Sequence, residues 1–60
     1  MNKQDCQVLE AMRKYGGGFM KALSEAGSRA DSVNLAKIKA AFPEYWAEYT
    51  HLAELDKDRQ

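Results

Sequence analysis

Residue types that commonly perform chemistry in proteins are scarce in this chain. Cys6 and His51 are the only cysteine and the only histidine among the 60 residues. A cysteine nucleophile needs a neighbouring base and a third group that orients that base, and a structural zinc site needs four ligands. Two such residues near opposite ends of the sequence meet neither requirement. We therefore expect no catalytic residue, no metal site, no cofactor and no enzymatic activity.

The glycine triplet Gly16-Gly17-Gly18 is the second feature that could carry chemistry, because backbone amides of glycine-rich loops bind phosphate groups. A nucleotide-binding loop of this type also needs a Lys followed by Ser or Thr after the glycines, and here Phe19 and Met20 follow. We therefore interpret the triplet as a turn between two packed helices. In such a turn the glycines are expected to supply left-handed backbone conformations.

Charges balance over the whole chain but not along it. Nine Lys and Arg residues oppose nine Asp and Glu residues, so the protein lacks the strong positive charge typical of nucleic-acid binders. Residues 1–42 hold seven basic and four acidic residues, a net charge of +3, and residues 43–60 hold two and five, a net charge of −3. This asymmetry is compatible with ordinary solvated surfaces, with a basic surface for phosphate groups, or with an acidic last segment that meets a basic partner or a second copy.

The sequence also bears on localisation. No apolar run approaches the roughly 18 residues that a membrane span requires. The first residues lack the apolar stretch and the small-residue cleavage site of a secretory signal, and a lone cysteine is typical of a reducing compartment. We therefore expect a cytoplasmic protein that has no contact with a membrane.

Apolar residues recur every three or four positions in each segment between the Gly and Pro residues. This spacing is typical of amphipathic helices, and no window alternates apolar and polar residues as a half-buried strand would. We predict one compact all-α domain over residues 1–60, a bundle of three to four short helices. The predicted helices span residues 3–15, 18–27, 32–42 and 43–56, and residues 55–60 are expected to form a frayed tail.

Individual residues mark the predicted helix ends. Asn2 can cap the first helix and Asp31 or Ser32 the third. Gly27 is expected to end the second helix, and Pro43 suits the first turn of the fourth. The predicted core consists of Val8, Leu9, Met12, Phe19, Leu23, Leu35, Ile38, Phe42, Tyr49 and Leu52.

Four of the six aromatic residues lie within positions 42–49. Tyr45 and Trp46 lie about 100° apart around a helix, so a small bundle cannot easily bury every ring, and Tyr and Trp are enriched in interface hot spots. Tyr45, Trp46 and Tyr49 are therefore the candidate protein interface. Burial barely offsets chain entropy in so small a core, which favours a homodimer.

A helix-turn-helix DNA-binding unit is the alternative interpretation of the middle of the chain. It would place Gly27 in the turn and its second helix at about residues 31–41. Leu23 occupies a position where such motifs usually have a small residue, and Asp31 would face phosphates unfavourably. The candidate nucleic-acid contacts in this interpretation are Arg29, Ser32, Asn34 and Lys37.

A resemblance to a known group rests on YGGGF at 15–19, Ala30-Asp31, LAKIKAAFPEYW at 35–46, and Tyr49. Over nearly the whole chain, this pattern resembles small, mostly uncharacterised proteins encoded by bacteriophages and prophages. The resemblance implies a bacterial host cytoplasm and transfers no functional residues. It implies a protein that acts by binding a host enzyme, a defence complex, a phage repressor or DNA. The balanced charge favours protein-protein binding among these, by a non-catalytic inhibitor or modulator of a host or defence factor. The expected partners are a second copy and a host or phage protein, with DNA as the alternative.

Overall fold

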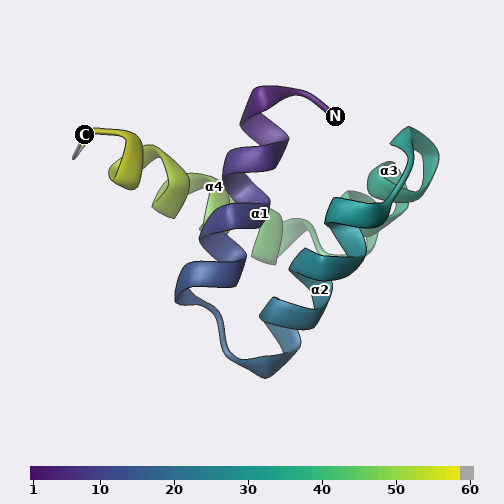
Figure 1. Ribbon diagram of the computed structural model, residues 1–60, viewed down its shortest axis with the longest axis horizontal. Helices are drawn as coiled ribbons and strands as arrows, with labels where there is room; N and C mark the ends of the chain where they lie inside the picture. The colour runs from purple at the N-terminus through teal and green to yellow at the C-terminus, as the bar shows by residue number, and fades with distance from the viewer. Residues whose placement is uncertain (59–60) are drawn as a thin grey trace.

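Four α-helices make up nearly all of the structure, a computed structural model that describes residues 1–58 (Figure 1). They are α1 (Lys3–Tyr15), α2 (Gly18–Arg29), α3 (Ser32–Ala41) and α4 (Pro43–Asp58). Residues 1–58 contain no strand. The all-α class and the compact helical bundle predicted from the sequence are confirmed.

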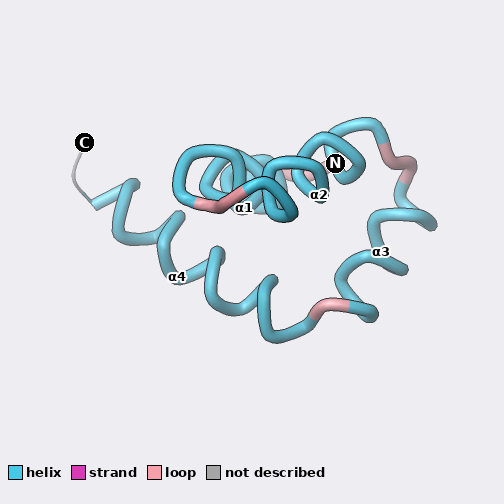
Figure 2. Tube along the Cα trace, turned by 90° about the horizontal axis from the view of Figure 1, so that it is seen from below, coloured by secondary structure: helices cyan, strands magenta, loops and turns pink. Residues whose placement is uncertain are grey.

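Helix α1 is the centre of the arrangement, because it packs against both α2 and α4. Helices α1 and α2 form a hairpin, and α4 crosses α1 on the far side in the view of Figure 1. Helix α3 joins the end of α2 to the start of α4 and lies apart from α1 (Figure 2). Its backbone comes close to the rest of the molecule only near α2 and α4, the helices that precede and follow it in the chain. One helix of the four therefore contributes little to the packing.

Side-chain caps fix the beginnings of α1 and α3. The Asp5 amide donates a hydrogen bond of 2.7 Å to Asn2 Oδ1, and the Asn34 amide donates one of 2.8 Å to Asp31 Oδ1. Both bonds satisfy amides that have no partner within the first helical turn. The structure thus confirms Asn2 as a cap and selects Asp31 over Ser32.

Helix α2 continues past Gly27 to Arg29, so the prediction that Gly27 ends this helix is wrong. Gly27 is buried inside the helix, where a Cβ atom would lie 2.5 Å from Leu9 Cδ2. One turn earlier, the Ser24 hydroxyl donates a 2.9 Å hydrogen bond to the Leu9 carbonyl. Small residues at these two positions let α2 approach α1 closely.

The glycine triplet forms the expected turn between α1 and α2, but not with the expected backbone. No residue among 1–58 has a positive φ, so the prediction of left-handed glycines is wrong. Gly16 is needed for space, since a Cβ there would overlap the Met20 side chain and lie 2.6 Å from the Met12 carbonyl oxygen. A Cβ on Gly17 would meet no atom within 4 Å.

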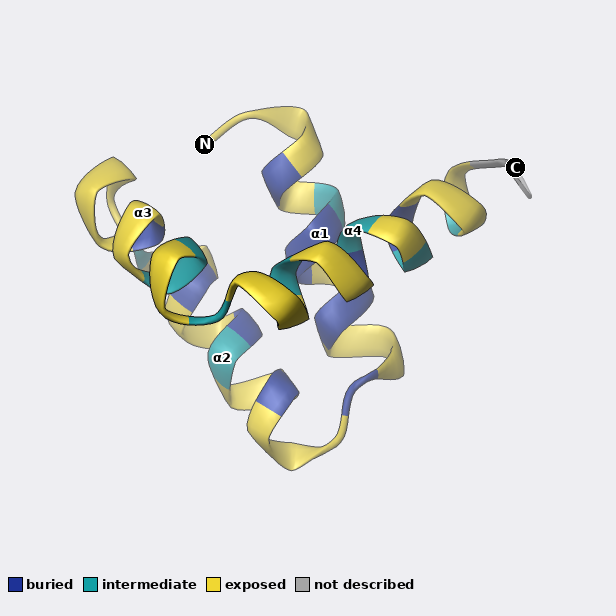
Figure 3. Cartoon of the chain, turned by 180° about the vertical axis from the view of Figure 1, so that it is seen from behind, coloured by how far each residue is buried: buried dark blue, intermediate teal, exposed yellow. Residues whose placement is uncertain are grey.

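The core lies mainly along α1 and the faces of α2 and α4 that meet it, while most of α3 is exposed (Figure 3). Half of the ten predicted core residues are buried, and Leu23, Ile38, Phe42 and Leu52 are half-buried. Phe19 is 57% exposed, so its assignment to the core is wrong. Its neighbour Met20, 100° further round the helix, occupies the inward position against Gly16. The buried residues that the prediction omitted are Asp5, Ala11, Gly16, Met20, Ser24, Gly27 and Ala53.

Helix α4 ends at Asp58, two residues beyond the predicted end. Its last turns are tied to α1, because Asp56 accepts hydrogen bonds from Lys14 Nζ at 2.9 Å and from the Tyr15 hydroxyl. Residues 55–58 of the predicted tail are helical in the structure. Residues 59–60 of the predicted tail lie outside the described residues.

The two glycines of the α1–α2 turn provide a matched test of the packing. Gly16→Ala should lower the free energy of unfolding by about 2 kcal/mol, because the new methyl group overlaps Met20 and the Met12 carbonyl. Gly17→Ala should change stability by less than about 1 kcal/mol in either direction, since its methyl group enters open space and restricts the unfolded chain but replaces a glycine at the N-cap of α2. Urea denaturation measures both values. Equal effects of the two substitutions would contradict the tight turn at Gly16.

Candidate functional site

Three aromatic rings from different elements gather at one corner of the molecule. Phe19 comes from the first turn of α2, Phe42 caps the end of α3, and Tyr45 lies in the first turn of α4. The Phe19 ring centroid lies 5.8 Å from that of Phe42, in an edge-on arrangement, and 6.2 Å from that of Tyr45. The Phe42 and Tyr45 centroids are also 6.2 Å apart. We call Phe19, Phe42 and Tyr45 the aromatic patch.

Helix boundaries bring these rings together. The glycine turn starts α2 at Gly18, and since Met20 takes the inward position, Phe19 points away from the core. Pro43 starts a new helix directly after Phe42, because its ring disfavours continuation of the preceding helix and suits a first turn. Tyr45 then lies close to Phe42, and both face Phe19.

The aromatic patch remains accessible to solvent although its rings contact one another. Phe19 is 57% exposed and Tyr45 is 42% exposed, while Phe42 is half-buried. Ring pairs of this geometry add about 0.5–1.5 kcal/mol each beyond area burial, which holds the three rings in one arrangement. An exposed and ordered apolar surface of this kind is typical of an interaction site.

The three residues predicted as a protein interface differ in their exposure to solvent. Tyr49 is 6% exposed and belongs to the core, and Trp46 is half-buried and packs against the same core. Tyr45 is the exposed member of the three. Sequence reasoning missed Phe19 as a surface residue because an apolar residue next to a helix start was assigned to the core. The signal that could have identified it is Met20, which competes for the same inward position.

An ion pair between a buried carboxylate of α1 and a half-buried lysine of α3 links α3 to α1. Asp5 of α1 is 8% exposed, and its Oδ1 atom lies 3.0 Å from Lys39 Nζ of α3. The same ammonium group lies 5.1 Å from the centroid of the Trp46 ring of α4, in a cation-π contact. Lys39 therefore links three helices at a place where α3 has few other contacts.

The candidate nucleic-acid contacts are all exposed and lie at the end of α2 and along α3. Arg29 Nε donates a 2.8 Å hydrogen bond to Glu25 Oε1, and this carboxylate partly neutralises the guanidinium charge. Lys37 makes no ion pair within residues 1–58. The turn between α2 and α3 is formed by Ala30 and Asp31, not by Gly27 as the helix-turn-helix interpretation required.

Cys6 and His51 are both exposed. Cys6 lines a groove between α1 and α4 to which His51 does not contribute. Within residues 1–58, no three His, Cys, Asp or Glu side chains are placed to hold a metal ion.

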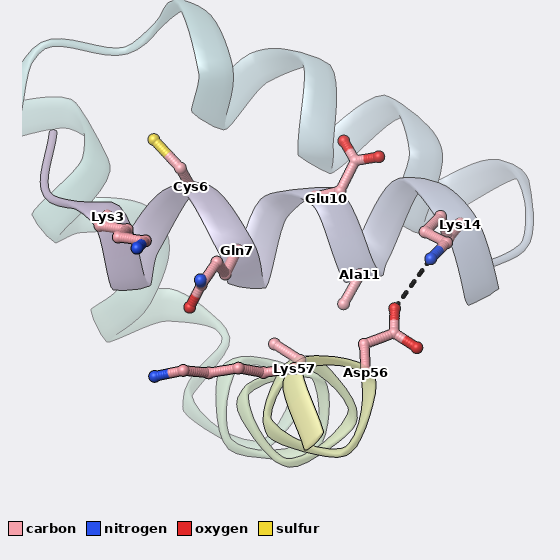
Figure 4. A pocket seen from close by; sticks show the side chains of 9 residues that line it. Lys3, Cys6, Gln7, Glu10, Ala11, Lys14, Asp56 and Lys57 are labelled. Atoms are coloured by element: carbon pink, nitrogen blue, oxygen red, sulfur yellow. Dashed lines mark hydrogen bonds and ion pairs between the residues drawn. The ribbon is translucent and has the colours of Figure 1, made fainter. Parts of the chain in front are cut away.

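A groove with a volume of about 470 Å³ lies between α1 and the C-terminal half of α4. Its floor includes Ala11 and Ala53, whose small side chains leave the space open. Figure 4 shows the Lys14–Asp56 pair at one end of it. The hydrogen bond to Asp56 raises the pKa of Lys14.

Comparison of the chain with protein-family models, curated proteins and solved structures gave no match. Within the part of the chain that the structure describes, no helix has the length and apolar character needed to cross a membrane.

The Asp5–Lys39 pair can be tested against a neighbouring lysine of the same helix. Lys39→Met should lower the free energy of unfolding by about 1 kcal/mol, because it keeps the apolar stem but leaves the Asp5 carboxylate without its cation. Lys37→Met is the control and should change stability by less than about 0.5 kcal/mol, since Lys37 is exposed. Chemical denaturation of both variants measures the difference. Equal stability of the two variants would contradict a structural role for the pair.

Proposed function

We propose that this protein is a non-catalytic binding module that contacts other protein chains through the aromatic patch. The observation that carries the proposal is the ordered but exposed packing of Phe19, Phe42 and Tyr45 at 5.8–6.2 Å. Aromatic side chains lose little conformational entropy on binding and dominate interface energetics. Here the rings already hold one another in place, so a partner would find a preorganised apolar surface.

Helix α3 extends this surface. Apolar residues occur on all its sides, and a helix of that kind is normally buried, yet Leu35 is its only fully buried residue. Val33 is 62% exposed, and the alanines near its end are exposed as well. Helix α3 ends at Ala41, and Phe42 of the aromatic patch follows as its C-cap, so the exposed alanines near this end directly precede the patch in the chain.

Among possible partners, this surface favours a second copy of the chain. A two-fold dimer brings the same surface together from both subunits, so the surface must complement itself. The aromatic patch can pack against its own copy, and the two helices that meet at Phe42 carry exposed charges of opposite sign, Lys37 on α3 and Glu44 and Glu48 on α4. Opposite charges on neighbouring helices allow favourable pairing across a two-fold axis.

The resemblance to small phage-encoded proteins gives this proposal a setting. In a bacterial cytoplasm, a dimer of this kind would act as an inhibitor or modulator that binds a host or phage protein. The same aromatic surface, or the rim that dimerisation leaves exposed, would make that contact.

Binding of DNA through α3 is the second candidate function. Its support is that Arg29, Ser32, Asn34 and Lys37 are all exposed around the start of α3. Against it, Asp31 caps α3 at the same place and Arg29 is paired with Glu25. Only two of the four candidate contacts are cations, which is few for a protein that must neutralise several phosphates.

Light scattering on a gel-filtration column tests the dimer. At low micromolar concentration the chain should have twice the mass of the 6.8 kDa monomer. Phe19→Ala and Tyr45→Ala should each weaken association by about tenfold or more, the loss expected for an interface hot spot, and should retain the helical circular dichroism spectrum. Leu55→Ala removes an exposed apolar side chain of α4 that lies outside both the patch and α3, and it serves as the control. A monodisperse monomer, or an equal effect of Leu55→Ala, would contradict self-association through the patch.

The DNA alternative is tested by the salt dependence of binding. Our proposal predicts no saturable binding to duplex DNA at physiological ionic strength. If DNA binding is found, Arg29→Ala and Lys37→Ala should each reduce the slope of log affinity against log salt by about 1. Such a result, with loss of affinity in both variants, would favour the helix-turn-helix interpretation over protein binding.

A further inference from the structure

The groove between α1 and α4 has an uneven distribution of charge along its length. At one end, Lys14 is paired with Asp56, and on the α1 side Glu10 is paired with Arg13. The hydrogen bond from Arg13 lowers the pKa of the Glu10 carboxyl, so this side chain stays ionised and paired with Arg13. The ionic groups of this part of the groove therefore cancel.

The other end of the groove carries a net positive charge. Lys3 and Gln7 lie one turn apart on α1, Lys57 lies on α4, and Figure 4 shows the three side chains gathered at this end. Neither lysine makes an ion pair within residues 1–58. The two ammonium groups thus face a shared opening without a protein carboxylate to balance their charge, and the neutral Gln7 carboxamide lies beside them.

The chemistry of these groups selects a class of ligand. Each ammonium has three donors and the carboxamide two more, and lysine binds phosphate as a point charge. A phosphomonoester carries a charge of about −1.5 to −2 at neutral pH on three terminal oxygens, which matches two lysines better than the single charge of a carboxylate does. The groove beyond the lysines is floored by Ala11 and Ala53, and its open volume can receive the organic part of such a ligand.

We propose that the Lys3–Gln7–Lys57 end of the groove binds the phosphate group of a small phosphomonoester, with the ester group lying over Ala11 and Ala53. Glu54 of α4 borders the same opening from an adjoining concavity and has no ion pair within residues 1–58. Its carboxylate opposes an anion and keeps the affinity modest. The site lies on α1 and α4 away from the aromatic patch, so it is independent of the proposed protein-binding function.

Amide chemical shifts of the ¹⁵N-labelled full chain test the site, in titrations with inorganic phosphate and with phenyl phosphate at constant ionic strength. Both probes should produce saturable shifts at Lys3, Gln7 and Lys57. Phenyl phosphate should bind more tightly and also shift Ala11 and Ala53. Phenol, which lacks the phosphate, should not shift the lysine positions.

Matched variants separate a built site from general attraction of anions to a lysine-containing surface. Lys3→Gln and Lys57→Gln should each weaken binding of phenyl phosphate by about tenfold, the scale of one charge-assisted hydrogen bond. Glu54→Gln should strengthen it severalfold, because the opposing carboxylate is removed. Lys37→Gln, on α3, should leave it unchanged.

Three results would overturn the proposal. They are absence of saturable shifts with either probe, equal weakening by Lys37→Gln and Lys57→Gln, and shifts centred on the amides of residues 16–18 in place of the groove. Because the variants keep the aromatic patch intact, dimer mass measured on the same samples reports independently on the protein-binding function.

Discussion

The close contact between α1 and α2 is the constraint on which the rest of the structure depends. A Cβ atom would overlap the Met20 side chain at Gly16 and would meet Leu9 at Gly27, and the Ser24 hydroxyl donates a hydrogen bond to the Leu9 carbonyl. Leu9 of α1 therefore packs close to the backbone of α2 at Gly27, and Leu9 and Met12 are almost fully buried. A chain of this size has one thin core, and that core forms along this contact and is completed by Tyr49 and Ala53 of α4.

The contact between α1 and α2 also determines which side chains remain exposed. Once Met20 packs against Gly16, the preceding residue, Phe19, must point away from the core. Helix α3 spans the distance from α2 to α4 with little packing of its own, and the Lys39 contacts to Asp5 and Trp46 hold it in place. The aromatic patch is thus a consequence of how the core is packed, and its rings are positioned by elements that the core and this ion pair hold.

Sequence reasoning identified the helices and several caps because these depend on local rules. Apolar spacing, Asn2, Asp31 and Pro43 act within a turn or two of their own position. The errors concern contacts between distant segments. Glycine is typical of helix ends, but Gly27 lies inside α2 because it packs against Leu9, eighteen residues away in the sequence. Phenylalanine is typical of cores, but Phe19 is exposed because its neighbour Met20 occupies the inward position. The groove combines Lys3 with Lys57, a pairing that no local pattern indicates.

The central claim is that the aromatic patch and the adjoining side of α3 are the surface by which this protein meets another copy of itself. A dilution series of the ¹⁵N- and ¹³C-labelled chain, followed by NMR through the expected monomer–dimer transition, tests it residue by residue. The account predicts concentration-dependent shifts at Phe19, Phe42, Tyr45 and the exposed positions of α3, with the α1–α2 core unchanged. Shifts absent across the series, or centred on the α1–α4 groove, would contradict it.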